Sequence, residues 1–198
     1  MSEVLKNPRI QAEITPEWFT SVLHDAGLIG EAVVTAVDVT EVGVGRGYIC
    51  LTVRLTPNYS PAQPDAPSSF VMKMPSPMTY PEEDLVRLIG EFAATEAYWY
   101  RDLAAESPVR VARCYWHSVD VEAGCSWLLL EDLGTLRAID QATGCSLPEV
   151  QLAVTALARI HGRWWERPEV RQLPWLTGPA YQGELWQRRS LGRVNKLR

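Results

Sequence analysis

The chain has 198 residues, enough for one ordinary domain or for one domain and part of a second. Its hydrophobic content of 46% and charged content of 22% are typical of a soluble globular protein, and no apolar run approaches the roughly 20 residues of a membrane span. A formal net charge of −5 gives no support for general nucleic-acid binding.

The cysteines have no metal-binding spacing. Neither a Cys-x-x-Cys pair nor a histidine beside a cysteine occurs, so a zinc site is not expected. Free thiols in a reducing compartment are the simplest account of this pattern. The first residues lack the apolar core of a signal peptide, and these features together predict a cytoplasmic protein.

A short helix and a hairpin are the first elements that the sequence predicts. Thr15 is a candidate N-cap ahead of a proline, and Gly27 is a candidate C-cap, which predicts an amphipathic helix over residues 14–28. Residues 33–42 are rich in valine and threonine, and residues 48–55 alternate between apolar and polar side chains. A hairpin with a glycine-rich turn is therefore expected here.

A single lysine interrupts the short apolar stretch of residues 69–75, which follows an expected exposed loop over residues 57–68. The stretch predicts a buried strand with Lys73 in its middle. Because a buried ammonium needs an anion nearby, a carboxylate of the chain or a bound phosphate is expected beside Lys73. The alternative is an edge strand from which Lys73 extends into solvent.

The longest predicted helix covers residues 82–105. Its large apolar residues recur at helical spacing and are Leu85, Leu88, Phe92, Trp99 and Leu103. Glu96 falls on this stripe, and a carboxylate on a packing face is costly unless it is paired. Glu96 is therefore the expected partner of Lys73, and the alternative is that Glu96 lies at the margin of the stripe and reaches solvent.

Two further strands are expected, over residues 111–119 and 126–130, followed by the acidic connector of residues 131–134. The order of elements predicts an α+β fold with a five-stranded, mostly antiparallel sheet and the long helix on one face. Residues 135–145 are expected to form a loop. A helix from Ser146 to about residue 165 should follow, with Ser146 and Glu149 forming a capping box.

Five segments, taken in order, resemble the N-terminal lobe of the aminoglycoside phosphotransferase and choline kinase-like superfamily, and are closest to its ecdysteroid kinase-like (CHK kinase-like) branch. The matching segments are Val42–Tyr48, Phe70–Lys73, Glu96–Leu103, Leu128–Leu133 and Leu157–His161. The resemblance implies a protein-kinase-like N-lobe with its hinge over residues 1–133. It implies a linker and the first helix or helices of a truncated helical C-lobe over residues 134–198.

The resemblance also implies ATP as the ligand and phosphate transfer to a hydroxyl group of a small molecule. The glycines would cover the phosphates, the lysine would contact the α and β phosphates beside its glutamate, and the hinge backbone would hold adenine. The implied nucleotide-binding residues are Gly43, Gly45, Gly47, Lys73, Glu96, Glu131 and Leu133. His161 is interpreted as a structural residue.

The chain departs from the family pattern after the hinge. The family's His-Gly-Asp-x-x-x-x-Asn loop is not matched, because His161 and Gly162 are followed by an arginine, and no aspartate follows Trp165. No catalytic residue or magnesium ligand is therefore assigned, and the chain alone is expected not to transfer phosphate at a useful rate. A truncated product, half of a split kinase and a nucleotide-binding remnant all stay open.

The alternative function is a non-catalytic α+β interaction module. The helix after residue 146 would expose its apolar stripe unless further helices cover it, so residues 146–190 could bind a separate C-lobe chain, another partner or a second copy. The tryptophans expected to have little cover are Trp164, Trp165, Trp175 and Trp186.

Overall fold

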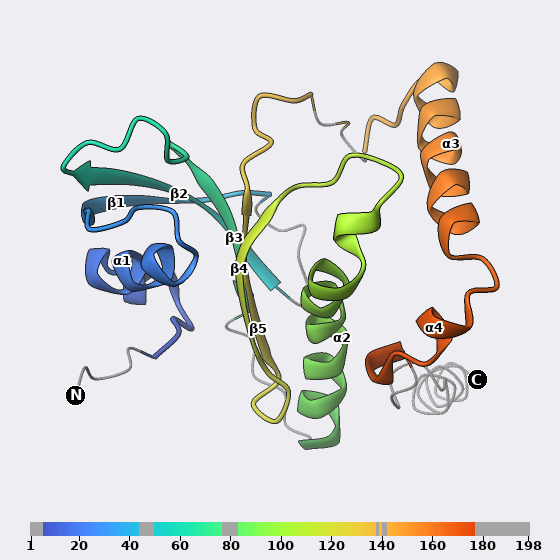
Figure 1. Ribbon diagram of the computed structural model, residues 1–198, viewed down its shortest axis with the longest axis horizontal. Helices are drawn as coiled ribbons and strands as arrows, with labels where there is room; N and C mark the ends of the chain where they lie inside the picture. The colour runs from blue at the N-terminus through green and yellow to red at the C-terminus, as the bar shows by residue number, and fades with distance from the viewer. Residues whose placement is uncertain (1–5, 44–49, 77–82, 138, 140–141, 177–198) are drawn as a thin grey trace. The chain divides into compact units, whose positions relative to one another are not determined.

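The computed structural model describes residues 6–43, 50–76, 83–137, 139 and 142–176 (Figure 1). The chain divides into two compact units. The first consists of residues 1–97 and 112–133, and the second of residues 98–111 and 134–198. Within the described part of the chain, no helix combines the length and the hydropathy that crossing a membrane requires.

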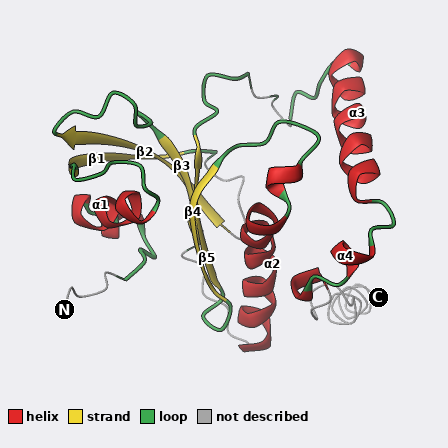
Figure 2. Ribbon diagram, viewed as in Figure 1, coloured by secondary structure: helices red, strands yellow, loops and turns green. Residues whose placement is uncertain are grey.

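The first unit contains a five-stranded sheet in the order β1-β2-β3-β5-β4, in which every neighbouring pair is antiparallel (Figure 2). This confirms the expected α+β class and the five-stranded sheet. The strands are β1 (Val33–Glu41), β2 (Cys50–Ser60), β3 (Phe70–Pro75), β4 (Cys114–Asp120) and β5 (Cys125–Glu131).

Strand β2 is longer than the sequence predicts, because it continues through Pro57 into the expected loop. Pro57 lies opposite Val37 of β1, whereas β3 pairs only with residues 50–55 of β2. The end of β2 therefore has a partner strand on one side only. A proline, which has no N–H to donate, is tolerated at such a position.

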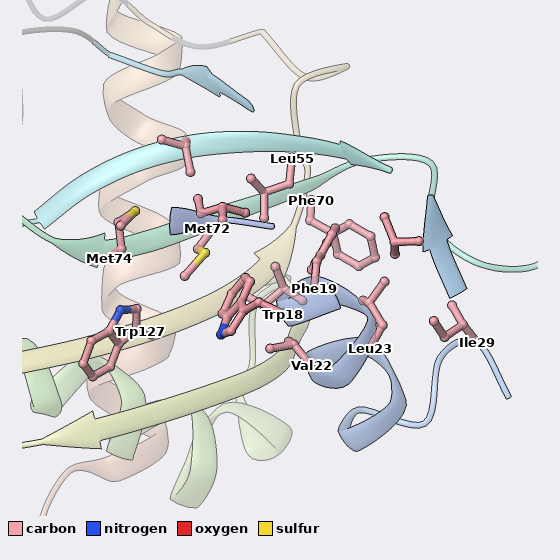
Figure 3. Close-up of a cluster of buried hydrophobic side chains, with 14 of the residues drawn as sticks. Trp18, Phe19, Val22, Leu23, Ile29, Leu55, Phe70, Met72, Met74 and Trp127 are labelled. Atoms are coloured by element: carbon pink, nitrogen blue, oxygen red, sulfur yellow. The ribbon is translucent and has the colours of Figure 1, made fainter. Parts of the chain in front are cut away.

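The core of the first unit lies between the sheet and helix α1 (Pro16–Asp25), as Figure 3 shows. One face of β3 contributes Phe70, Met72 and Met74, which are fully buried. From α1, the ring of Phe19 packs edge to face on Phe70, with 5.4 Å between the ring centroids. The expected N-cap of α1 is confirmed, because the Thr15 hydroxyl accepts a hydrogen bond from the Trp18 N–H. The C-cap is Ala26 and not the expected Gly27, which follows it with φ of 66°.

Helix α2 (Glu83–Asp102) covers the opposite face of the sheet, but not with the stripe that its sequence indicates. Among the α2 residues whose burial the structure describes, Gly90, Ala94 and Ala97 are buried, whereas Phe92, on the other side of the helix, stays partly exposed. Leu85 and Leu88 lie in the helix, but their side chains are outside the described part. The helix therefore approaches the sheet through small residues that the expected stripe did not include.

The close approach is clearest at Gly90. A Cβ atom added to Gly90 would lie 2.6 Å from the Val121 carbonyl oxygen and 2.8 Å from the Cα of Gly124. Gly124 itself has φ of 67°, in the left-handed region, and turns the chain between β4 and β5. Two glycines thus let the backbone of α2 rest on this turn.

The second unit is helical. Its main element is α3 (Leu147–Trp164), accompanied by α4 (Pro168–Arg171) and by short 3₁₀ helices at Ala104–Glu106 and Pro174–Leu176. The expected start of α3 is confirmed, since the Ser146 N–H donates a hydrogen bond of 2.6 Å to the Glu149 carboxylate.

The expectation of uncovered tryptophans was only partly right. Trp165 is 71% exposed, but Trp164 packs edge to face on Trp99 of α2. Trp175 donates a hydrogen bond of 2.8 Å to the Asp102 carboxylate. Trp186 lies outside the described residues. The end of α2 therefore anchors two of the four tryptophans within the second unit.

We expect Gly90→Ala to lower the free energy of unfolding by about 1–3 kcal/mol, because the new methyl group meets backbone atoms that cannot rotate away. Gly162→Ala in α3 is the matched control, since nothing lies within 4 Å of its added Cβ and alanine favours a helix. Urea unfolding followed by circular dichroism measures both. A Gly90→Ala protein as stable as the parent would contradict the close approach.

Candidate functional site

Lys73 and Glu96 form an ion pair between β3 and α2. Lys73 lies on the α2 side of β3, because its neighbours Met72 and Met74 point into the core on the other side. The expected partner is therefore confirmed. The edge-strand alternative is wrong, because β3 lies between β2 and β5.

The pair is not buried, which corrects the expectation for Lys73. Its side chain is 30% exposed and that of Glu96 is 38% exposed. Only one face of β3 belongs to the core, whereas the sequence suggests a strand buried on both faces. An ammonium that is oriented by a carboxylate and still reaches solvent can also contact a bound anion.

The start of the glycine-rich turn is in register with Lys73. The Val42 N–H donates a hydrogen bond of 2.9 Å to the carbonyl of Thr52, and Thr52 lies opposite Lys73 in the β2–β3 pair. Gly43 has φ of 71°, a conformation that glycine adopts without strain. Gly45 and Gly47 lie outside the described residues.

The connector begins at the other end of β3. Glu131 lies opposite Phe70, three residues along the strand from Lys73, which corresponds to about 10 Å. The Glu131 N–H donates a hydrogen bond of 2.8 Å to the Arg113 carbonyl, so this group is already engaged within the sheet. Leu133 is partly exposed in the irregular segment that follows.

A second ion pair, which local sequence patterns do not predict, fixes the connector. The Arg54 guanidinium donates through Nε and Nη2 to the two oxygens of Asp132, at 2.6 and 3.3 Å. The Ser69 hydroxyl donates a further hydrogen bond of 2.8 Å to Asp132. The hydrogen bond and the charge of Asp132 both raise the pKa of Arg54. The sequence features that could have suggested this pair are Arg54, which shares a face of the sheet with Lys73, and Asp132, an acid of the connector with no predicted partner.

Burial raises the thiol pKa of two cysteines that lie close enough to Glu96 for its charge to add to the effect. Burial raises the pKa of Cys50, against the opposing effect of Lys73, and burial raises that of Cys114 to about 11. Both are therefore thiols at neutral pH and poor nucleophiles. No group of three or more His, Cys, Asp or Glu suited to a metal ion occurs in the described part of the chain.

No protein-family model, curated protein or solved structure matches the chain. What the site can bind is therefore inferred from its geometry. That geometry consists of an oriented, partly exposed ammonium, a glycine turn that starts in register with it, and an anchored connector about 10 Å away.

We expect iodoacetamide at pH 8 to modify the exposed Cys145 well before Cys114, because a pKa of about 11 instead of 9.0 makes the Cys114 thiolate ~100-fold rarer. The unfolded chain releases this proton more readily than the folded one, so the Cys114 contribution to stability should fall as pH rises from about 9 to 11.

Peptide mass spectrometry over time gives the order of alkylation. Urea unfolding at a series of pH values, for the parent and for Cys114→Ala, isolates the contribution of this thiol from those of other groups. Equal alkylation of Cys114 and Cys145, or the same pH dependence in both proteins, would contradict the expectation.

Proposed function

We propose that the first unit is the ATP-binding lobe of a small-molecule phosphotransferase, with the kinase-like fold of the aminoglycoside phosphotransferase and choline kinase-like proteins that its sequence resembles. The observation that carries the proposal is the Lys73–Glu96 ion pair. Protein kinases use a lysine on the third strand, paired with a helix glutamate, to hold ATP phosphates. Lys73 is on the third strand here, and Glu96 is on the helix that follows it.

Each element of the site has a use in this proposal. Lys73 contacts the α and β phosphates, and Glu96 keeps the ammonium aimed at them. The turn that starts at Gly43 and includes Gly45 and Gly47 covers the phosphates with backbone N–H groups. The backbone at Glu131 and Leu133 holds the adenine edge, about 10 Å along β3 from Lys73 and the phosphates.

The magnesium that such a reaction needs has no proposed site in this chain. The described residues offer no cluster of carboxylate and histidine ligands that fits a metal ion. The acceptor class, a hydroxylated small molecule, comes from the sequence resemblance alone. The proposal therefore concerns nucleotide binding by the first unit.

The second candidate, a non-catalytic interaction module, is favoured by α3. Four apolar residues of this helix recur at spacings of three and four and are at least 40% exposed, so the second unit itself does not cover them. They are Leu147, Val150, Val154 and Leu157. A surface of this kind fits a partner helix.

We expect ATP with magnesium to raise the melting temperature of the protein. At about ten times its Kd, a ligand adds about 1.4 kcal/mol to the free energy of unfolding, or roughly 4–7 °C for a unit of this size. Lys73→Ala should abolish most of the rise, because it removes the phosphate contact. Glu96→Gln should reduce the rise in part, because the lysine is then poorly oriented.

Lys6→Ala is the matched control, since it removes an exposed lysine from the N-terminal segment of the same unit and should leave the rise unchanged. Differential scanning fluorimetry measures all four proteins, and calorimetric titration gives the Kd values. No shift at millimolar ATP, or the same shift in Lys73→Ala, would reject nucleotide binding and favour the interaction module.

Phosphate transfer is a separate prediction. We expect the 198-residue chain by itself to release ADP no faster than a protein-free control when ATP, magnesium and a mixture of hydroxylated small molecules are supplied. A coupled assay for ADP checks this. Steady release that Lys73→Ala abolishes would show that the chain is an active enzyme.

A further inference from the structure

We propose that Arg54 is the platform for the purine ring of the bound nucleotide, and that Asp132 is the positioning residue that holds its guanidinium in place. This inference rests on the proposed function and adds to that site a base-recognition residue that lies outside the segments carrying the family resemblance. It depends on three features of Arg54: its place on the sheet, its restraint by Asp132 and its exposure.

The place of Arg54 on the sheet is between the phosphate end and the base end of the proposed site. Arg54 lies opposite Val71, two pairs along from Thr52 and Lys73, and therefore on the same face of the sheet. Diagonal neighbours of this kind have Cα atoms roughly 7–8 Å apart. The side chain of Arg54 then extends to the connector, where it meets Asp132. Any base held by the connector backbone therefore lies next to this guanidinium.

The guanidinium is restrained in a way that suits a flat ligand. Two of its nitrogens are bonded to Asp132, and the Ser69 hydroxyl holds the same carboxylate from the start of β3. A planar group fixed through two bonds loses little conformational entropy when a second planar group stacks on it.

The two partners of this ion pair differ in exposure. The Asp132 side chain is 9% exposed, whereas that of Arg54 is 38% exposed. The carboxylate is therefore largely enclosed by protein, whereas part of the guanidinium group is accessible to a ligand. Arginine stacks on aromatic rings through cation–π attraction and planar contact, and every purine offers such a ring.

Stacking on the base and attraction to the phosphates make different predictions, so the test compares two probes. ATP carries both a base and phosphates, whereas inorganic tripolyphosphate carries the charge without the base. We expect Arg54→Leu to raise the Kd for ATP about three- to tenfold. The Kd for tripolyphosphate should change by less than a factor of about two, because Lys73 still binds it.

Arg54→Lys is the decisive variant, because it keeps the charge and can still pair with Asp132 but removes the planar group. It should weaken ATP binding about as much as Arg54→Leu does and leave tripolyphosphate binding unchanged. Asp132→Asn should weaken ATP binding by a smaller factor and leave the Kd for tripolyphosphate unchanged. Arg9→Ala, which truncates an exposed arginine of the N-terminal segment of the same unit, is the matched control and should bind both probes as the parent does.

Isothermal titration calorimetry on the full chain measures each Kd, and melting temperatures without ligand show that each variant is folded. If Arg54→Leu fails to fold, Arg54→Lys carries the test. ATP binding that Arg54→Lys leaves unchanged, or a parallel loss of ATP and tripolyphosphate, overturns the role of Arg54 while the proposed function stands. Failure of the parent to bind ATP removes the proposed function as well as this inference.

Discussion

The two faces of β3 have opposite chemistry, and the arrangement of the first unit depends on this difference. Phe70, Met72 and Met74 point into the core under α1, and Lys73 points the other way. Because side chains alternate along a strand, a slip of one residue would place Lys73 in the core and expose the methionines. The hydrophobic core therefore fixes the direction of the ammonium before any ligand is present.

Glu96 meets Lys73 because of a second constraint, the close approach of α2 to the sheet. Gly90, Ala94 and Ala97 bring the helix backbone within reach of the strands, and Gly124 makes room for it at the β4–β5 turn. With larger side chains at these positions the helix axis would lie further from the sheet. The ion pair is thus a consequence of small residues that are not themselves charged.

These constraints explain what the sequence could and could not predict. Local sequence patterns were enough for all five strands, for the N-caps of α1 and α3, and for the pairing of Lys73 with Glu96. The small buried residues of α2 were missed, because glycine and alanine give a weak hydrophobic signal whereas Phe92 gives a strong one. Arg54 and Asp132 are separated by 78 residues, and their contact depends on a strand order that local patterns do not contain.

The two ion pairs hold different elements against the same face of the sheet. Lys73–Glu96 joins the sheet to α2, and Arg54–Asp132 joins the β1–β2 hairpin to the connector. The pairs share no residue, and β2 and β3, which carry Arg54 and Lys73, are directly paired. A shift of α2 would therefore break the first pair and leave the second intact. The contact of Lys73 with a ligand's charge depends on α2, whereas the contact of Arg54 with a ligand's ring depends on the connector. A substitution can therefore change one contact without the other.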